Sequence, residues 1–574
     1  MLRQKEKSLT VVLLSALVGL IVGLAAISIK KLIYTVETYA ISYFPSYLFF
    51  GLPLIGLLLV NFLNQNFFSR MATFKGMQHV IKAIENQQSY INIRLIYSKF
   101  ITSATTIAFG GSSGMEAAII TSGSSIGSNI GKYFKMNYQL RTLLIGCGTA
   151  SGISAMYNAP IGGFLFALEV ILPKFTPALL IPLLIASATG KILFEMIMGE
   201  NLRFDTHVTS FSYASFPYII LMGLIGALTA IYMIRCYAFS SKYLSRLHNP
   251  YVIALAGGAI LGSLIFLFPA LYGEGYVSIN HLLHGNENLL WENSVLKGPG
   301  FQWIHGLVLL SMLFFLRPVS TGLSLSSGGE GGYFAPSLVA GGLAGYLFYK
   351  IIFLLYGHLN GLDANMMVFL GMAATFACVM RAPVTAIFLI ADTTQSYSLI
   401  VPLMIATTIG YVFKNYIDAY NPLLKSGHTT IRMEKFIINQ INLREILEPV
   451  DSLVSEDFTL RKLIEHFASH HYNIIPVQNE QGKISGVIAL NKIREMMKEF
   501  ENYDTVNARQ IMSKEFVVCD LRHLRKMLSD KPAVVNETVI LVQNRGTFTG
   551  YVSKYKVLNI YNEYLSEPDR LFNK

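Results

Sequence analysis

Residues 109–131 read FGGSSGMEAAIITSGSSIGSNIG, and this stretch decides the expected fold. Glu116 is the only charged residue between Lys99 and Lys132. A lone carboxylate in a long apolar, glycine-rich run is costly in a membrane and marks a functional candidate. The glycines and serines before it predict an unwound segment leading into a helix that begins near Glu116. Because the free N–H groups at a helix start favour an anion, the carboxylate and an anion could compete there.

The composition of the 574-residue chain indicates a polytopic membrane protein. Charged residues make up 14%, whereas a soluble domain carries about a quarter. The net charge of +11 fits cytoplasmic loops and anionic headgroups, so we expect no nucleic-acid partner. A basic N-terminus precedes an uncharged run at 11–29, which predicts a first membrane helix and a cytoplasmic N-terminus in a plasma (inner) membrane. The four cysteines show no metal-ligand spacing, and no metal site is expected.

A gapless internal repeat extends the pattern along the chain. Residues 148–169, GTASGISAMYNAPIGGFLFALE, align with residues 371–392, GMAATFACVMRAPVTAIFLIAD. Both copies carry Ala-Pro at matching positions, and Glu169 matches Asp392. Apolar segments continue to about residue 415, and several are short or interrupted by Gly, Pro or Ser. This is the pattern of repeat-built transporters whose half-helices meet at a midplane site.

The composition changes after about residue 425, where charged residues become frequent. We therefore predict a membrane domain at 1–425 and a soluble domain at 426–574. The soluble domain has its own repeat, since IIPVQNEQGKISGVIALNKI at 474–493 resembles VILVQNRGTFTGYVSKYKVL at 539–558. Each copy predicts a strand, a Gly-containing turn, a strand and a helix. Two such copies resemble a tandem pair of CBS domains, a cytoplasmic regulatory module.

Several motifs in the membrane domain occur in a fixed order. They are Gly114-Met115-Glu116-Ala117-Ala118, Tyr157-Asn158-Ala159-Pro160, GGYFAP at 331–336, Arg381-Ala382-Pro383-Val384-Thr385, and Tyr420 in DAYNPLL. Together they resemble the CLC family of chloride channels and proton-coupled chloride exchangers over nearly the whole chain. The resemblance implies an all-α inverted repeat with broken helices, followed by the α/β CBS pair. It also implies a homodimer in the bilayer with one pathway per subunit for chloride or a similar small anion.

The resemblance assigns candidate anion ligands. It implies that amides at Tyr333 and Phe334 and the Tyr420 hydroxyl hold the anion, that Met115 lies beside the site, and that Glu116 is the gate. The family's Gly-Ser-Gly-Ile-Pro motif aligns with Phe74-Lys75-Gly76-Met77-Gln78, which makes Lys75 and Gly76 candidates too. Lys75 could bind an anion or pair with Glu116. Alternatively, it extends to the cytoplasmic surface.

A further departure concerns the mode of transport. Val170 stands where exchangers of the family usually carry an internal glutamate. The expected function is therefore gated anion conduction, with proton-coupled exchange as the alternative. A non-transporting anion sensor is a further alternative, since Lys75 replaces a familiar motif. The chain is not expected to be an enzyme, because it contains no P-loop, HExxH or nucleophile elbow.

Two remaining groups of residues bear on ligands. Nucleotide-binding CBS domains commonly carry Gly-x-x-Thr-x-x-Asp, whereas this chain places Ser553, Lys492 and Lys556 at the matching positions. The lysines could contact phosphates, but a solvated helix face is the preferred interpretation, and no cofactor is expected. Glu330, in GGEGG, would oppose an anion nearby unless it is protonated or paired.

Overall fold

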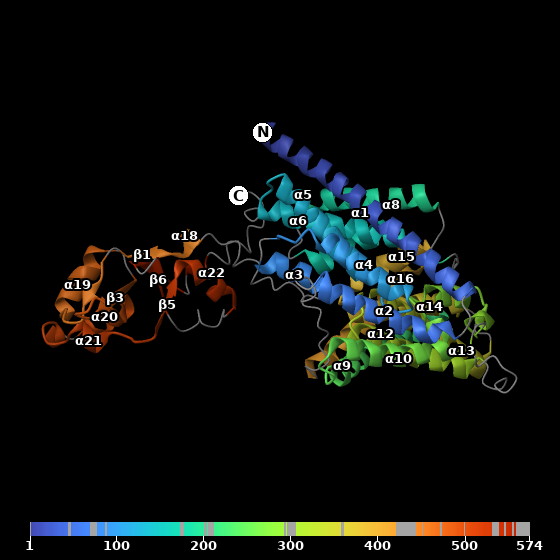
Figure 1. Ribbon diagram of the computed structural model, residues 1–574. Coiled ribbons are helices and arrows are strands. Elements are labelled where there is room, and N and C mark those ends of the chain that lie inside the picture. Colours follow the sequence, from blue (N-terminus) through green and yellow to red (C-terminus); the bar gives the residue numbers. More distant parts are fainter. Residues whose placement is uncertain are drawn as a thin grey trace. The chain divides into compact units, whose positions relative to one another are not determined.

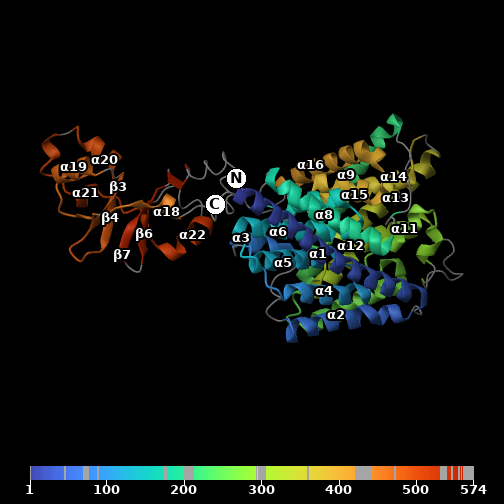
Figure 2. The same ribbon diagram turned by 90° about the horizontal axis from the view of Figure 1, so that it is seen from above.

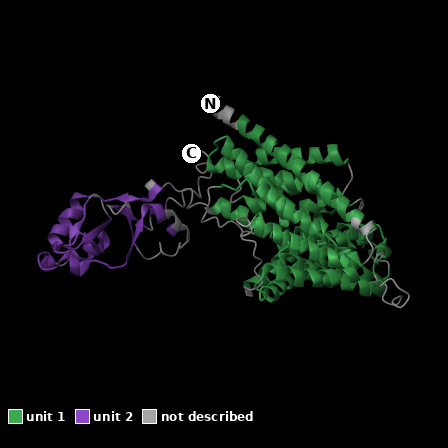
Figure 3. Cartoon of the chain, viewed as in Figure 1, with its two compact units in different colours: residues 1–431 green, residues 432–574 purple. Residues whose placement is uncertain are grey.

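The computed structural model divides the chain into two compact units, residues 1–431 and 432–574 (Figure 3). It describes residues 2–43, 47–68, 77–86, 89–172, 177–199, 204, 212–291, 294, 306–357, 361–420, 443–450, 452–470, 473–498, 500–530, 539–544, 547–553, 556, 557 and 559. The predicted domain boundary between 425 and 426 lies in 421–442, outside the described residues.

Helices form the first unit (Figure 1). They are α1 (Leu2–Tyr43), α2 (Leu48–Asn66), α3 (Met77–Asn86), α4 (Leu95–Ala108), α5 (Glu116–Tyr133), α6 (Tyr138–Tyr157), α7 (Pro160–Phe166), α8 (Pro177–Met198), α9 (Phe216–Leu244), α10 (Pro250–Leu267), α11 (Tyr276–Leu283), α12 (Leu307–Ser326), α13 (Phe334–Tyr356), α14 (Ala364–Met380), α15 (Pro383–Thr394) and α16 (Ile400–Tyr420). Short turns lie at Ala167–Ile171, Tyr213–Ser215, Pro269–Leu271, Glu287–Trp291 and Tyr397–Leu399.

Only some of these helices are long enough to span a membrane. Within the described residues, eight helices are long and apolar enough to cross a bilayer, while the apolar helices at Pro160–Ile171, Ala364–Met380 and Pro383–Thr394 are shorter. The apolar run at 100–131 is thus two helices, α4 and α5, separated by the glycine-rich loop. This mixture of full spans and interrupted helices confirms the predicted polytopic membrane fold.

The helix pairs α5–α6 and α13–α14 show the duplication in three dimensions. Gly123 and Gly341 are each the eighth residue of their helix. A Cβ on Gly148 would collide with the Gly123 carbonyl oxygen, and a Cβ on Gly371 would collide with that of Gly341. The aligned glycines therefore let both helix pairs pack backbone to backbone. Figures 1 and 2 also show α1 lying alongside α6 and α8, which it contacts.

Both copies of the Ala-Pro motif end one helix and start the next in the same way. Asn158 and Arg381, the C-caps of α6 and α14, have φ values of 54° and 57°. This left-handed turn ends each helix. Pro160 and Pro383 then occupy the first turn of α7 and α15, where a missing N–H costs nothing.

The aligned carboxylates join the two halves reciprocally. Glu169, in the π-helical turn after α7, accepts hydrogen bonds from the backbone N–H and hydroxyl of Thr385 at 2.8 and 2.7 Å. Asp392, near the end of α15, accepts from the N–H groups of Ile161 and Gly162 at 2.7 and 3.0 Å. The end of each helix thus caps the start of the other, so α7 and α15 run antiparallel. This arrangement is what an inverted repeat requires.

The second unit contains two copies of one α/β element. The first copy comprises β2 (Val454–Ser455), α19 (Leu460–Ser469), β3 (Ile474–Gln478), β4 (Ile484–Ala489) and α20 (Leu490–Met496), and the second comprises β5 (Phe516–Asp520), α22 (Leu521–Asp530), β6 (Val539–Asn544) and β7 (Thr547–Val552). Further elements are α18 (Leu443–Ile446), β1 (Glu448–Pro449), the turn Phe500–Asn502 and α21 (Ala508–Ile511).

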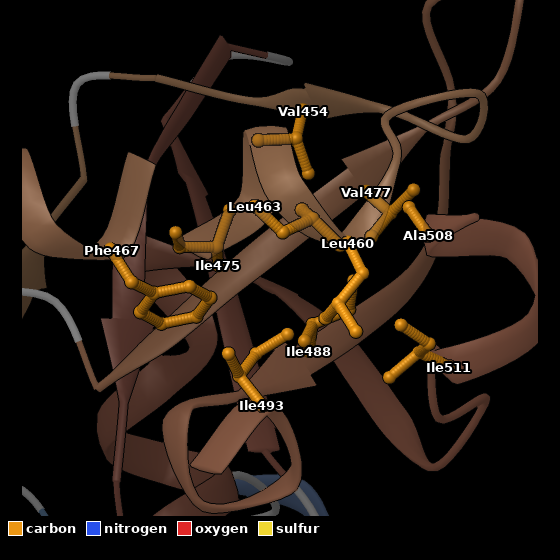
Figure 4. Packing of buried hydrophobic residues seen from close by; sticks show 10 residues of the cluster. All are labelled: Val454, Leu460, Leu463, Phe467, Ile475, Val477, Ile488, Ile493, Ala508 and Ile511. Carbon is orange, nitrogen blue, oxygen red and sulfur yellow. The ribbon is translucent and has the colours of Figure 1, made fainter. Parts of the chain in front are cut away.

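The sheets of the second unit have strand orders β2-β3-β4 and β1-β7-β6-β5. In both copies the first pair is parallel and the hairpin is antiparallel, with the register shifting after Val477 and after Val542. The predicted strand–turn–strand–helix order is confirmed in the first copy, and the predicted hairpin is confirmed in the second. A core of Leu463, Ile475 and Ile488 joins α19 to β3 and β4 (Figure 4).

Candidate anion-binding site

Two helix starts meet at the predicted site. The loop before α5 and the loop before α13 are joined by a pair of backbone hydrogen bonds between Gly114 and Gly332, both 2.9 Å long. Since α5 begins at Glu116 and α13 at Phe334, two sets of helix N-terminal N–H groups lie close together. Such a pair of positive helix ends favours a negative group between them.

The Glu116 carboxylate is that negative group in this structure. Its side chain is 0% exposed, so it is shielded completely from solvent. One oxygen accepts a hydrogen bond from the Tyr157 hydroxyl, and the other accepts a long one, 3.4 Å, from the backbone N–H of Ala335. The carboxylate thereby links the start of α5 to the first turn of α13.

The close approach of Glu116 to the start of α13 requires a glycine at position 114. A Cβ on Gly114 would collide with a carboxylate oxygen of Glu116, and it would also lie 2.9 Å from the Ala335 nitrogen. Contacts below 3.0 Å are essentially never made by real Cβ atoms. The glycine-rich sequence before α5 is therefore explained in part by the need to bring two backbones and a carboxylate together.

Aromatic side chains line this region. Phe334 stacks on Tyr157 with ring centroids 5.2 Å apart and meets Phe376 edge-on at 4.5 Å. The Tyr157 hydroxyl also lies 2.6 Å from the Tyr276 hydroxyl. Glu116 is therefore hydrogen-bonded to Tyr157, whose hydroxyl is linked in turn to that of Tyr276. Because the surrounding side chains are largely aromatic, this bond matters for stabilising a buried carboxylate.

Glu330 is paired rather than free. Its carboxylate lies 2.7 Å from the Lys99 ammonium, and their side chains are 9% and 4% exposed. The backbone of Glu330 is fixed as well, because its carbonyl accepts from the Ser113 hydroxyl at 3.3 Å. The predicted condition for tolerating this acid near an anion, a paired charge, is thus met. The pair also anchors the loop before α13.

The remaining predicted ligands fall in different places. Lys75 and Gly76 lie in 69–76, outside the described residues. Tyr420 is the last residue of α16, and its side chain is not among those described. The Met115 backbone N–H donates at 3.0 Å to a protein carboxylate, that of Glu274. Val170 is buried in the π-helical turn after α7.

Sequence reasoning missed several residues at this site. The backbone N–H of Ala335, which was not among the predicted ligands, contacts Glu116. The amides of Tyr333 and Phe334 stay predicted ligands for the anion. Glu274 was also overlooked, although it is the only Asp, Glu, Lys or Arg between Arg246 and Glu287 and has a glycine on each side. The same signal that singled out Glu116 would have found it. Tyr157 was noted only for its motif, and its hydroxyl carries no sequence signal.

The nucleotide candidates of the second unit have protein partners. The Ser553 hydroxyl donates to the Glu448 carboxylate at 2.6 Å, and Tyr551 donates to its other oxygen at 2.7 Å. Lys492 lies 3.5 Å from Glu495 on an exposed helix face, and Lys556 is exposed. A phosphate at Ser553 would meet a carboxylate already bound there. Nucleotide binding stays a prediction, as does the expectation of no cofactor.

The fold and this site together define a class: a helical membrane protein built from an inverted repeat around two facing helix starts. The sequence profile for the voltage gated chloride channel family matches residues 55–415, more than half of the chain. The chain belongs to this family, whose members transport anions across membranes rather than catalyse reactions. The predicted CLC resemblance is confirmed.

Known relatives and solved structures agree with this assignment. The H(+)/Cl(−) exchange transporter ClcA of Vibrio vulnificus is 27% identical over 74% of this chain and 91% of its own length. A putative chloride channel protein, ClcB-like, of Ralstonia nicotianae is 27% identical over 59% of this chain and 76% of its own length.

Two solved structures share the fold. The crystal structure of a CLC-type fluoride/proton antiporter matches with a TM-score of 0.58 and 23% identity, over 73% of this chain and 98% of that chain. The crystal structure of a eukaryotic CLC transporter matches with a TM-score of 0.60 and 16% identity, over 96% of this chain and 98% of that chain. The second match includes most of the C-terminal unit, in agreement with the predicted CBS pair.

Proposed function

We propose that this protein moves chloride or a similar small anion across a membrane with Glu116 as the gate, in exchange for protons. The observation that carries the proposal is the seat of the Glu116 carboxylate. It is fully buried and accepts from the Ala335 N–H, at the point where two helix starts meet. An anion reaches the same N–H groups only when the carboxylate leaves them.

Protonation is the natural way to release the carboxylate. A neutral carboxylic acid loses its electrostatic attraction to the helix starts, whereas an anion gains that attraction. One side chain then alternates between holding a proton and excluding an anion, which couples the two movements. The ClcA relatives are named H(+)/Cl(−) exchange transporters, which supports exchange over the conduction that Val170 favours.

Gated anion conduction, the function of a channel, is the second candidate because of Val170. Val170 is apolar, buried and lies one position after Glu169, where exchangers of the resembled family carry a second acid. Without that acid, protons from the cytoplasmic side need another relay to reach Glu116. Glu169 has a different role in this structure, since its two carboxylate oxygens cap the start of α15.

The setting of the site is part of the proposal. We infer a homodimer in a plasma or inner membrane, with the N-terminus and the C-terminal unit in the cytoplasm and Lys75 near the anion path. Exposed apolar side chains such as Met196, 77% exposed on α8, and Val412, 60% exposed on α16, fit contact with lipid or a second subunit. Mass measurement of the purified protein in detergent tests the dimer.

Proton and chloride fluxes in liposomes separate the candidates. With a chloride gradient as the only driving force, the wild-type protein should pump protons uphill. Glu116→Gln should reduce this proton movement to background while chloride still passes, because glutamine cannot exchange a proton. Glu195→Gln is the matched control, since Glu195 is a membrane-helix glutamate paired with Lys191 on α8.

Other outcomes identify the alternatives. Chloride flux without proton movement in the wild type would establish the channel, and bound chloride without any flux would establish the sensor. If Glu116→Gln leaves both fluxes unchanged, Glu116 is not the gate. Lys75→Ser is examined in the same assay: unchanged anion affinity and pH dependence would remove Lys75 from the pathway.

A further inference from the structure

A second buried carboxylate, that of Glu274, contacts the start of α5. The Glu274 side chain accepts a hydrogen bond from the Met115 backbone N–H at 3.0 Å. Met115 is the N-cap of α5, so this N–H belongs to the same helix start that carries Glu116. Glu116 thus occupies an N–H group of α13, while Glu274 occupies one of α5.

The loop that carries Glu274 is built to hold it there. The buried Arg317 guanidinium donates to the carbonyl oxygens of Leu271 and Gly273 at 3.0 and 2.8 Å, and also to that of Glu274. The Glu274 N–H donates to the Glu37 carboxylate at 3.0 Å. Gly273 has φ 60°, and a Cβ there would collide with that carboxylate. The loop is therefore fixed from two sides.

The charge around the α5 start is unfavourable to a further anion. Glu37, Glu116 and Glu274 are 8%, 0% and 6% exposed, and the buried Arg317 lies near Glu37 and Glu274. Lys99 is already paired with Glu330. An ionised carboxylate on the Met115 N–H repels a second anion there, so an incoming anion has to take the place of that carboxylate.

One member of this cluster, Glu37, lies at a recess. A surface recess is lined by Glu37, Gly275 and His281, among others. Glu37 therefore lies both at the recess and against the Glu274 N–H. The recess therefore borders two neighbours of Glu274, namely Gly275, which follows it in the chain, and Glu37, which accepts from its backbone N–H.

We propose that Glu274 is a second carboxylate that competes with the transported anion, by occupying the Met115 N–H at the start of α5. The inference rests on the proposed anion path and adds a specificity-determining residue to it. An anion that replaces Glu274 takes the Met115 N–H as a ligand, and one that replaces Glu116 takes the Ala335 N–H. Two carboxylates thus set how tightly an anion is held.

The decisive variant is Glu274→Gln in the full-length protein. Glutamine has the same shape, and its amide oxygen still accepts from the Met115 N–H, so the helix start keeps its cap. Its neutral oxygen is a weaker acceptor than a carboxylate. Chloride should therefore bind about tenfold more tightly, which is the change expected for losing about 1.4 kcal/mol of competition. Isothermal titration with chloride in detergent measures this.

A matched control and a second variant complete the experiment. Glu287→Gln removes a partly buried carboxylate that contacts Tyr346 and Lys350 instead, and it should leave chloride affinity unchanged. Should Glu274→Gln not fold, Glu274→Asp serves, because it withdraws the carboxylate from the Met115 N–H while keeping the charge. Anomalous scattering from bromide-soaked crystals should show an ion at the Met115 N–H in the variant and not in the wild type.

The outcomes separate this inference from the function it rests on. Unchanged or weaker chloride affinity in a folded Glu274→Gln protein would make Glu274 a structural cap only and would overturn the inference. If Glu116→Gln alters chloride affinity and Glu274→Gln does not, only the role of Glu274 fails. If neither variant alters chloride affinity, the proposed anion path does not pass these two helix starts. Tighter binding in Glu274→Gln with bromide at Met115 supports the proposal.

Discussion

The two halves of the membrane unit share their scaffold and differ at the site. The Gly123–Gly148 and Gly341–Gly371 contacts match, as do the caps on α7 and α15. The helix starts do not match, because α5 begins with the carboxylate of Glu116 and α13 begins with Phe334. Residues that both copies retain hold helices together, whereas the proposed anion chemistry lies where the copies diverged. This division predicts which substitutions affect stability and which affect transport.

The largest loss of stability should come from the shared glycines. Gly148→Ala places a Cβ against the Gly123 carbonyl oxygen, so α5 and α6 must separate. We expect a loss of about 3 kcal/mol in the free energy of unfolding, and a similar loss for Gly371→Ala. Thermal or denaturant unfolding in detergent measures both. Gly51→Ala is the control, since no atom lies within 4 Å of a Cβ built there.

Equal stability of Gly148→Ala and Gly51→Ala would contradict the close packing of α5 on α6. A loss at Gly148 without one at Gly371 would show that the two halves are not held in the same way. The matching glycine contacts, which are the strongest similarity between the halves, would then not stabilise them equally.

The reciprocal caps should matter less, and unequally. Asp392 is buried at 4% exposure and accepts two backbone N–H groups of α7, so Asp392→Ala should cost about 2 kcal/mol by leaving them unsatisfied. Glu169 is only half-buried, and Glu169→Ala should cost about 1 kcal/mol. Unfolding of both single variants and the double variant tests this. Asp392→Asn, which keeps an acceptor oxygen, should recover part of the loss.

The double variant sharpens the comparison further. Independent caps predict losses that add within about 0.5 kcal/mol. A much smaller combined loss would mean that α7 and α15 release each other together, so that the two caps act as one contact. A larger loss for Glu169→Ala than for Asp392→Ala would contradict the role of burial.

Local sequence signals predicted the scaffold well. The glycines before Glu116, and its being the lone charge in an apolar run, predicted a helix start there. The helix α5 begins at that residue. The Ala-Pro positions and aligned carboxylates predicted the repeat, and both copies adopt the same caps. These features depend on backbone preferences within a few residues, which a sequence displays directly.

Local signals could not predict which distant residues contact Glu116 and Met115. The Tyr157–Glu116 bond joins residues 41 apart, the Met115–Glu274 bond 159 apart and the Ala335–Glu116 bond 219 apart. Each depends on how helices pack rather than on the residues beside it. Helix starts offer several neighbouring N–H groups, and the packing of α13 brings that of Ala335 to 3.4 Å from the Glu116 carboxylate. The sequence therefore predicted that α5 begins at Glu116, but it did not predict which atoms of α13 and of the Glu274 loop meet that helix start.

The smallest expected effect tests the caps that end α6 and α14. Both adopt φ > 0, which Asn tolerates and which costs other side chains about 1 kcal/mol. Asn158→Ala should therefore destabilise by about 1 kcal/mol. Arg381→Asn should stabilise by about 0.5 kcal/mol, because it relieves the backbone and loses only a partly exposed ion pair with Asp418.

Asp418 keeps a second partner in the latter variant, since Lys414 lies 2.6 Å from it. Arg381→Lys, which retains both the charge and the strained backbone, should leave the free energy of unfolding nearly unchanged and serves as the control. If Arg381→Asn instead costs more than about 1 kcal/mol, the ion pair outweighs the backbone at this position. The two halves would then end their matching helices by different means, and the cap at Arg381 would join the divergent residues.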